Sequence, residues 1–172
     1  SIFSQEAFPL ESNCLRIPLL NAQIALGFLL FSLTHILVIW TLLAELTRHS
    51  SSPSTLMKNL AVLPKAVYLA KVFARQKVSH IHAHWGSSTS TCAYIAARLS
   101  NIPWSMTLHR WDIKENNMLR EKATSAMFIR TISEEGKLWT LQIVGDGFAN
   151  KVHVIHMGVR IPLDDAQSPN NA

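Results

Sequence analysis

The sequence predicts an α/β fold, a Rossmann-like parallel sheet with flanking helices. Four apolar runs recur along the second half of the chain at nearly even spacing. They occupy residues 78–83, 104–108, 127–132 and 152–155. Each gap between them is long enough for the crossover helix that a parallel pair of strands requires. Each run is also followed by a polar residue, so polar side chains are expected along one edge of the sheet.

That edge is the predicted active site, because ligands of open parallel sheets bind beyond the carboxyl ends of the strands. The polar residues at the four run ends are His84, His109, Ser133 and His156. Within the first run, His80, His82 and His84 alternate with apolar residues. A period of two therefore places these three imidazoles on one face of the strand.

Composition limits the class of protein and of partner. A chain of 172 residues can form one domain with a hydrophobic core, and 48% hydrophobic with 16% charged residues excludes a disordered chain. The net charge of +5 favours an anionic partner, such as a phosphate-bearing substrate or an acidic lipid surface. The basic residues are scattered and form no recognition motif, which argues against nucleic acid. Cys14 and Cys92 show no CxxC spacing and predict no disulfide framework.

A long apolar stretch precedes the predicted sheet. No charged residue occurs between Arg16 and Glu45, and residues 24–44 form a run of 21 residues that meets the length criterion for a transmembrane helix. His35, in mid-span, argues against spanning, because ionisable groups are costly inside a bilayer. The alternatives are a long helix that lies on the sheet and touches the membrane, and a helix buried in a larger protein. We predict a cytoplasmic chain peripheral to the inner face of the membrane, with 24–44 as a candidate span.

A polar break at residues 49–54 is the expected division of the chain. We predict an apolar, helical, membrane-proximal segment with its linker over residues 1–54 and a Rossmann-like acceptor-binding domain over 55–162. Residues 163–172 are expected to be an interdomain linker that is cut short. A helix at 55–75 is predicted to open the second unit, with Pro64 kinking or dividing it.

The turn after the first strand has the composition of an anion or hydroxyl site. Residues 86–90 are small and polar and open a helix, so they are expected to aim backbone N–H groups at a phosphate or a sugar hydroxyl. The turn lacks the glycine patterns of dinucleotide and triphosphate sites. Trp85 and Trp111 follow strand ends, where they are placed to stack on a sugar ring.

The turn after the second strand contains four different kinds of functional side chain in four consecutive residues. His109, Arg110, Trp111 and Asp112 supply a base, a cation, an aromatic ring and a carboxylate. We expect Asp112 to orient His109 or Arg110. In the third turn, Ser133 is placed as the N-cap of the following helix, and without a GxSxG elbow it does not predict a serine hydrolase.

A metal site is the first alternative. His82 and His84 have the HxH spacing with which many hydrolases present two zinc ligands, and His109, Asp112 and His156 lie at neighbouring strand ends. The remaining spacing of a metal site is absent, so we predict no metal ligand. His80 is interpreted as a structural or surface residue.

Four motifs together resemble the N-terminal half of a family 4 glycosyltransferase, over residues 77–162. They are HIHAHWG (80–86), NIPWSMTLHRWDI (101–113), FIRTISEEG (128–136) and KVHVIHMGV (151–159). The resemblance implies a GT-B architecture, in which an acceptor-binding and a donor-binding Rossmann-like domain face each other across a cleft. It further implies retaining transfer in polysaccharide biosynthesis, with a nucleotide-sugar as co-substrate and no metal or other cofactor. The donor domain would hold the nucleotide-sugar through an E-x7-E motif.

The resemblance also assigns roles to individual residues. His109 matches the histidine that lines the reacting sugar and Asp112 the acidic residue after it, and we expect both to be catalytic. The substrate-binding residues that we expect from the matched turns and their neighbours are His84, Trp85, Gly86, Ser87, Arg110, Ser133, Glu134 and Gly158.

Two departures from the family pattern bear on activity. The first strand with its glycine-rich loop is not recognisable before Ser1, and no donor domain follows Pro162. We therefore expect the N-terminal portion of a transferase, inactive in isolation, that acts on a glycan or lipid-linked acceptor. The alternatives are a metal-dependent hydrolase that uses His82 and His84, and a non-catalytic, membrane-docked module that binds sugar or phosphate.

Overall fold

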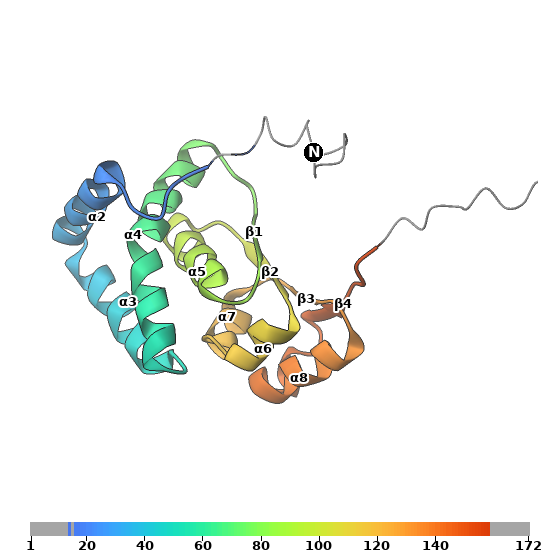
Figure 1. The fold of residues 1–172 in the computed structure, drawn as a ribbon. Coiled ribbons are helices and arrows are strands. Elements are labelled where there is room, and N and C mark those ends of the chain that lie inside the picture. Colours follow the sequence, from blue (N-terminus) through green and yellow to red (C-terminus); the bar gives the residue numbers. More distant parts are fainter. Residues whose placement is uncertain (1–13, 15, 159–172) are drawn as a thin grey trace, which may run out of the picture.

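The structure, a computed structural model, describes Cys14 and residues 16–158 (Figure 1). Three helices come first. They are α2 (Ala22–Thr34), α3 (Ile36–His49) and α4 (Pro53–Arg75). Strands then alternate with helices. The order is β1 (Ile81–His84), α5 (Ser88–Ser100), β2 (Trp104–Leu108), α6 (Arg110–Glu115), α7 (Leu119–Ser125), β3 (Ile129–Thr131), α8 (Glu134–Val144), the 3-10 turn η2 (Asp146–Phe148) and β4 (Val152–Val154).

The four strands form one parallel sheet in the order β1-β2-β3-β4, which confirms the predicted Rossmann-like α/β fold. The register pairs His84 with Thr107 and Ile129 with Val152. Right-handed crossovers between sequential neighbours place the connecting helices on one face of such a sheet. Contacts of α5 with α7 and of α7 with α8 are consistent with one continuous helical layer.

Alternation along β1 decides which side chains face the core. Ile81 and Ala83 are buried, whereas His82 and His84 are exposed, as the period of two predicts. The buried residues of the strands pack with those of α5 and α7, including Ile95 and Leu119, in one hydrophobic cluster. The opposite face is polar and presents the histidines.

Helix α4 is continuous through Pro64, so the prediction that Pro64 divides it is wrong. The helix begins where the Ser52 side chain accepts a hydrogen bond from the Thr55 backbone N–H at 3.1 Å, with a proline at its first position. Proline removes one backbone hydrogen bond. Leu63, Ala66 and Val67 on either side are buried, and α4 packs along α5, which compensates for that loss.

The apolar stretch at 24–44 is not one helix. It breaks at His35 into α2 and α3, which are bent by 107° relative to each other. The predictions of a single helix there, whether spanning or lying on the sheet, are therefore wrong. Among residues 14 and 16–158 no single helix has the length and apolarity to cross a membrane, although α2 and α3 meet that test as a bent pair. Both pack against α4, which lies between them and α5 in Figure 1.

Candidate functional site

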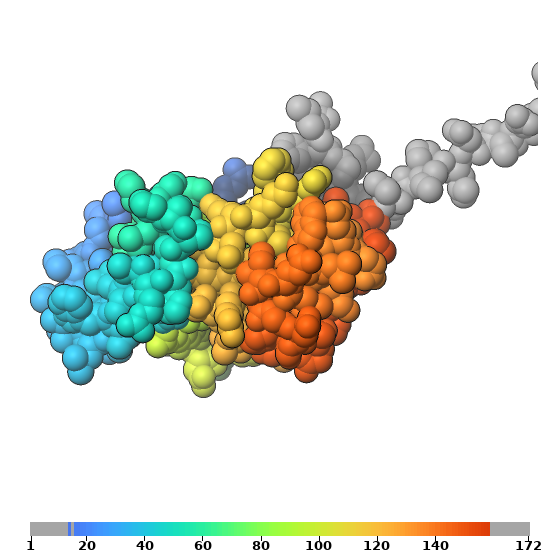
Figure 2. All heavy atoms as spheres, turned by 90° about the horizontal axis from the view of Figure 1, so that it is seen from below, coloured from blue at the N-terminus to red at the C-terminus, as the bar shows by residue number. Residues whose placement is uncertain are grey.

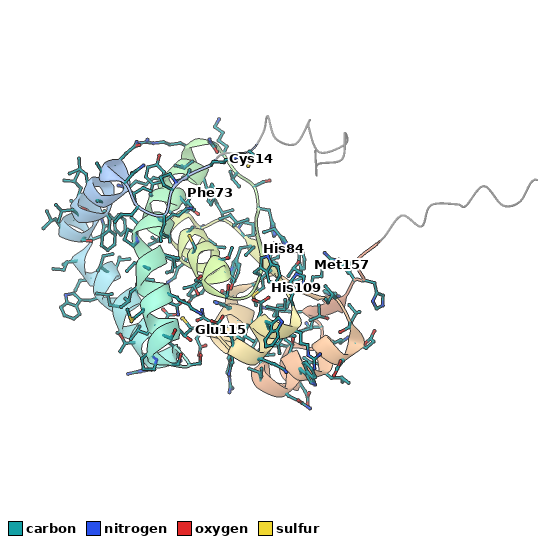
Figure 3. All side chains as sticks on the ribbon, in the orientation of Figure 1. Cys14, Phe73, His84, His109, Glu115 and Met157 are labelled. Atoms are coloured by element: carbon teal, nitrogen blue, oxygen red, sulfur yellow. The ribbon has the colours of Figure 1, made fainter. Side chains whose placement is uncertain are left out.

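Two imidazoles meet at the carboxyl ends of β1 and β2. His84 is the last residue of β1 and His109 follows the last residue of β2. Their Nε2 atoms lie 3.1 Å apart, with ring centroids at 4.9 Å (Figure 3). This confirms the prediction that neighbouring parallel strands bring the two rings together. At this distance one Nε2 donates its N–H to the lone pair of the other Nε2, so the two neutral rings are in opposite tautomers.

Trp85 completes a cluster of three rings. Its indole stacks on the His109 imidazole, with centroids 4.2 Å apart and planes 25° from parallel. Trp85 is 46% exposed and has a φ of +99°, a conformation that costs free energy for any residue but glycine. Its backbone N–H donates to the Thr107 carbonyl at 3.1 Å. The cluster thus presents aromatic surface and titratable nitrogens together at the strand ends.

The surroundings of His109 favour the neutral form of its imidazole. Burial lowers the pKa of His109 below its ordinary value, nearby His84 and Arg130 lower it further, and Asp112 acts in the opposite direction. A neutral imidazole at neutral pH is able to accept a proton or a hydrogen bond. His109 therefore has the protonation state of a base.

Asp112 acts on the main chain of this site. It is 4% exposed, and its Oδ2 accepts a hydrogen bond from the His109 backbone N–H at 2.9 Å. Asp112 thus orients His109 through the backbone at the start of α6, rather than through the imidazole. Helix α6 has only six residues and was not expected from the sequence.

The turn after β1 is tied to α7 through its carbonyl groups, and the expectation that its N–H groups face a ligand stays a prediction. The Gly86 and Ser87 carbonyls accept hydrogen bonds from Lys122 Nζ at 3.0 and 3.1 Å. Lys122 is fully buried and was missed in the sequence. A signal was present, since Lys122 lies on the face of α7 whose other members, Leu119, Ala123 and Ala126, are apolar and buried.

The other predicted residues lie apart from the rings or serve structure. Arg110 and Ser133 line a separate cavity of about 170 Å³. The Arg110 guanidinium lies over the Trp139 ring at 5.4 Å, and the Ser133 hydroxyl accepts from the Gly136 backbone N–H at 3.1 Å, which confirms Ser133 as an N-cap. Glu134 is exposed in the first turn of α8, and Gly158 is exposed at the end of the described chain.

Two histidines of the first strand region, one of them from the HxH pair of the metal alternative, are engaged in hydrogen bonds. His82 uses both ring nitrogens on hydroxyl groups, with Nδ1 at 2.7 Å from Ser105 Oγ and Nε2 at 2.9 Å from Thr107 Oγ1. His80 Nε2 also lies 2.7 Å from Ser105 Oγ. In the described part of the chain, no group of three or more His, Cys, Asp or Glu residues is placed to hold a metal ion.

An apolar cavity of about 400 Å³ lies beside the ring cluster, between α4, β1 and α5. Val62, Leu69 and Phe73 of α4 form one wall. His84 is part of the lining and belongs to both the cavity and the ring cluster. The polar groups of the lining include Lys65, whose Nζ donates to the Ile17 carbonyl at 2.8 Å.

Comparisons of the chain with protein-family models, with curated proteins and with solved structures found no match.

Removal of His84 tests the electrostatics of the pair. His84→Ala is expected to raise the pKa of His109 toward the ordinary histidine value, because it removes the electrostatic effect of the neighbouring imidazole and exposes the remaining ring. NMR titration of the imidazole resonances measures this shift. His153→Ala, at an exposed position of β4, is the control and should leave His109 unchanged. A His109 pKa that stays the same or falls in His84→Ala would contradict this account.

Proposed function

We propose that this chain is the acceptor-side portion of a retaining glycosyltransferase that works at a membrane surface. The observation that carries the proposal is the His84–His109 pair beneath the half-exposed Trp85, at the carboxyl edge of a parallel sheet. Ligands of such sheets bind at that edge. An aromatic face next to hydrogen-bonding nitrogens suits a sugar, which has apolar C–H faces and hydroxyl rims.

The chemistry assigned to the site is transfer of a sugar from a nucleotide-sugar to an acceptor hydroxyl. The bond between the sugar C1 and the nucleotide phosphate breaks, and a bond forms between C1 and the acceptor oxygen. His109, neutral at working pH, hydrogen-bonds the reacting groups and accepts the hydroxyl proton, and the nucleoside diphosphate leaves with the electron pair. Asp112 keeps His109 in place through its backbone.

The non-catalytic alternative rests on the same rings and differs in having no donor chemistry. A direct test titrates the protein with short oligosaccharides and short-chain glycolipids while the His84 and His109 resonances are followed by NMR. We expect saturable shifts at both histidines from an acceptor, and no turnover of nucleotide-sugars by the 172-residue chain alone. Release of nucleoside diphosphate by that chain would refute its predicted inactivity. A panel that shifts neither histidine would refute the sugar site.

The apolar surface of α2 and α3 supports the membrane part of the proposal. Its leucine, isoleucine and tryptophan side chains are each more than half exposed, and Figure 2 shows these two helices at one end of the molecule. The residues are Leu26, Leu29, Leu30, Leu33, Ile36, Leu37 and Trp40. A contiguous apolar face on adjacent helices is typical of contact with a lipid surface or a protein. The cavity beside His84 gives the lipid part of a lipid-linked acceptor a place next to the rings.

Membrane binding is expected to depend on the most exposed leucines. The double substitution Leu33→Gln and Leu37→Gln should abolish flotation with anionic vesicles, because burying each leucine in lipid contributes about 1.5–3 kcal/mol. The two side chains are 70% and 77% exposed, so the fold should be retained. Leu138→Gln, at a 62% exposed leucine of α8, is the matched control and should float like the parent protein. Equal flotation of all three proteins would count against this surface.

A further inference from the structure

The backbone at Trp85 is strained, and hydrogen bonds on both sides of the residue hold it in that conformation. A large aromatic residue at a φ of +99° is an outlier, and such conformations persist only where the surrounding structure holds them in place. On one side, the Trp85 N–H donates to the Thr107 carbonyl. On the other side, the next two residues, Gly86 and Ser87, offer their carbonyls to Lys122.

Lys122 is unusual in what it binds. Its Nζ is buried and donates to these two carbonyls, at 3.0 and 3.1 Å. The carboxylates that act on it are those of Asp112 and Glu115 on α6 and Glu121 on α7. Burial lowers the pKa of Lys122 to about 7, and these carboxylates oppose that shift. Burying a lysine costs stability unless its N–H groups find partners, and Lys122 donates to two carbonyls of one turn.

We propose that Lys122 is a positioning residue of the site, which clamps the Gly86–Ser87 turn from α7 and so holds Trp85 in its strained conformation over His109. Asp112 fixes the backbone of His109 from α6. The turns after β1 and β2 are thus each held by one buried ionisable residue, and the ring cluster lies between the two turns. The proposal concerns the geometry of the site and holds for any ligand that the site binds, so it does not depend on the proposed function.

The test replaces Lys122 with methionine, an unbranched side chain that is one atom shorter and has no hydrogen-bond donor. We expect Trp85 to leave the His109 ring. The His109 ring protons should then lose the upfield ring-current shift that a stacked indole causes, and the His109 pKa should rise toward its ordinary value as the ring becomes exposed. Both are read from NMR spectra of the histidine side chains.

Lys151 offers a matched control. Its Nζ donates to three carbonyls at the end of α7, those of Ala123, Thr124 and Ala126. Lys151→Met also removes lysine-to-carbonyl hydrogen bonds next to α7, and it should leave the His109 signals as in the parent protein. Unchanged His109 signals in a folded Lys122→Met variant would overturn the proposal, as would an equal change in both variants.

A measurement on the parent protein covers the case in which Lys122→Met does not fold. If Lys122 clamps the turn, the Trp85 amide should exchange its hydrogen only on global unfolding, with the same free energy of opening as the amide of the buried Ala123 in α7. Exchange of the Trp85 amide by local opening, well before that of Ala123, would overturn the proposal independently of any variant.

Discussion

His109→Ala is expected to lower the rate of sugar transfer by about 10²–10⁴-fold in any form of the protein that transfers sugar. The substitution removes the ring that contacts both His84 and Trp85 and that is held neutral by its surroundings. The fold should be retained, because the link between His109 and Asp112 uses the backbone N–H, which alanine keeps. The measurement is kcat with a saturating nucleotide-sugar, together with a thermal unfolding curve.

His153→Ala provides the comparison for this result. His153 is an exposed histidine of the same sheet, two strands away from β2, and its replacement should leave kcat unchanged. The pH dependence of kcat tests the role of His109 as a base. The kcat of the parent enzyme should fall at acidic pH as His109 becomes protonated, and His109→Ala should lack that fall. A His109→Ala enzyme that keeps a near-parental kcat would exclude His109 from the chemistry.

The sheet and the ring pair were accessible from the sequence because both depend on local pattern. Strand spacing sets the parallel order, and a strand end followed by a turn sets where His84 and His109 emerge. The strand bounds were less accurate, since β1 begins at Ile81 and β3 covers only Ile129–Thr131. A strand ends where its partner strand ends, and the length of an apolar run does not indicate which residue that is.

The misses involve residues whose roles are set by distant partners. No glycine or proline lies next to His35 to indicate a bend there. Helices α2 and α3 instead take their directions from packing on α4. Pro64 is tolerated because the helix around it is held against α5. Lys122 finds its partners 35 and 36 residues earlier in the chain, so hydrophobic periodicity alone points to its burial but not to its hydrogen bonds.

Gly86→Ala is expected to destabilise the protein by about 1–3 kcal/mol, the usual cost of overpacking a core, and to distort the site. A Cβ at this position would lie 2.3 Å from Leu108 Cδ2 and 3.0 Å from Asp112 Cβ. Leu108 is 0% exposed and Asp112 is 4% exposed, so the added Cβ requires either the Leu108 side chain or the turn to move. A shift of the turn away from β2 would carry Trp85 off His109 and pull the Gly86 carbonyl from Lys122.

Gly27→Ala isolates this steric effect from the general effect of replacing glycine. Gly27 lies inside α2 with nothing within 4 Å of an added Cβ, so alanine should stabilise the protein by up to about 1 kcal/mol through its higher helix propensity. Chemical denaturation of both variants gives the two free energies of unfolding, and the His109 resonances report the site. The free energy of unfolding is expected to fall in Gly86→Ala and to rise in Gly27→Ala, and the His109 resonances should shift only in Gly86→Ala. If Gly86→Ala were as stable as the parent protein with unchanged His109 signals, the close packing of this turn against Leu108 and Asp112 would not be what holds the ring cluster in place.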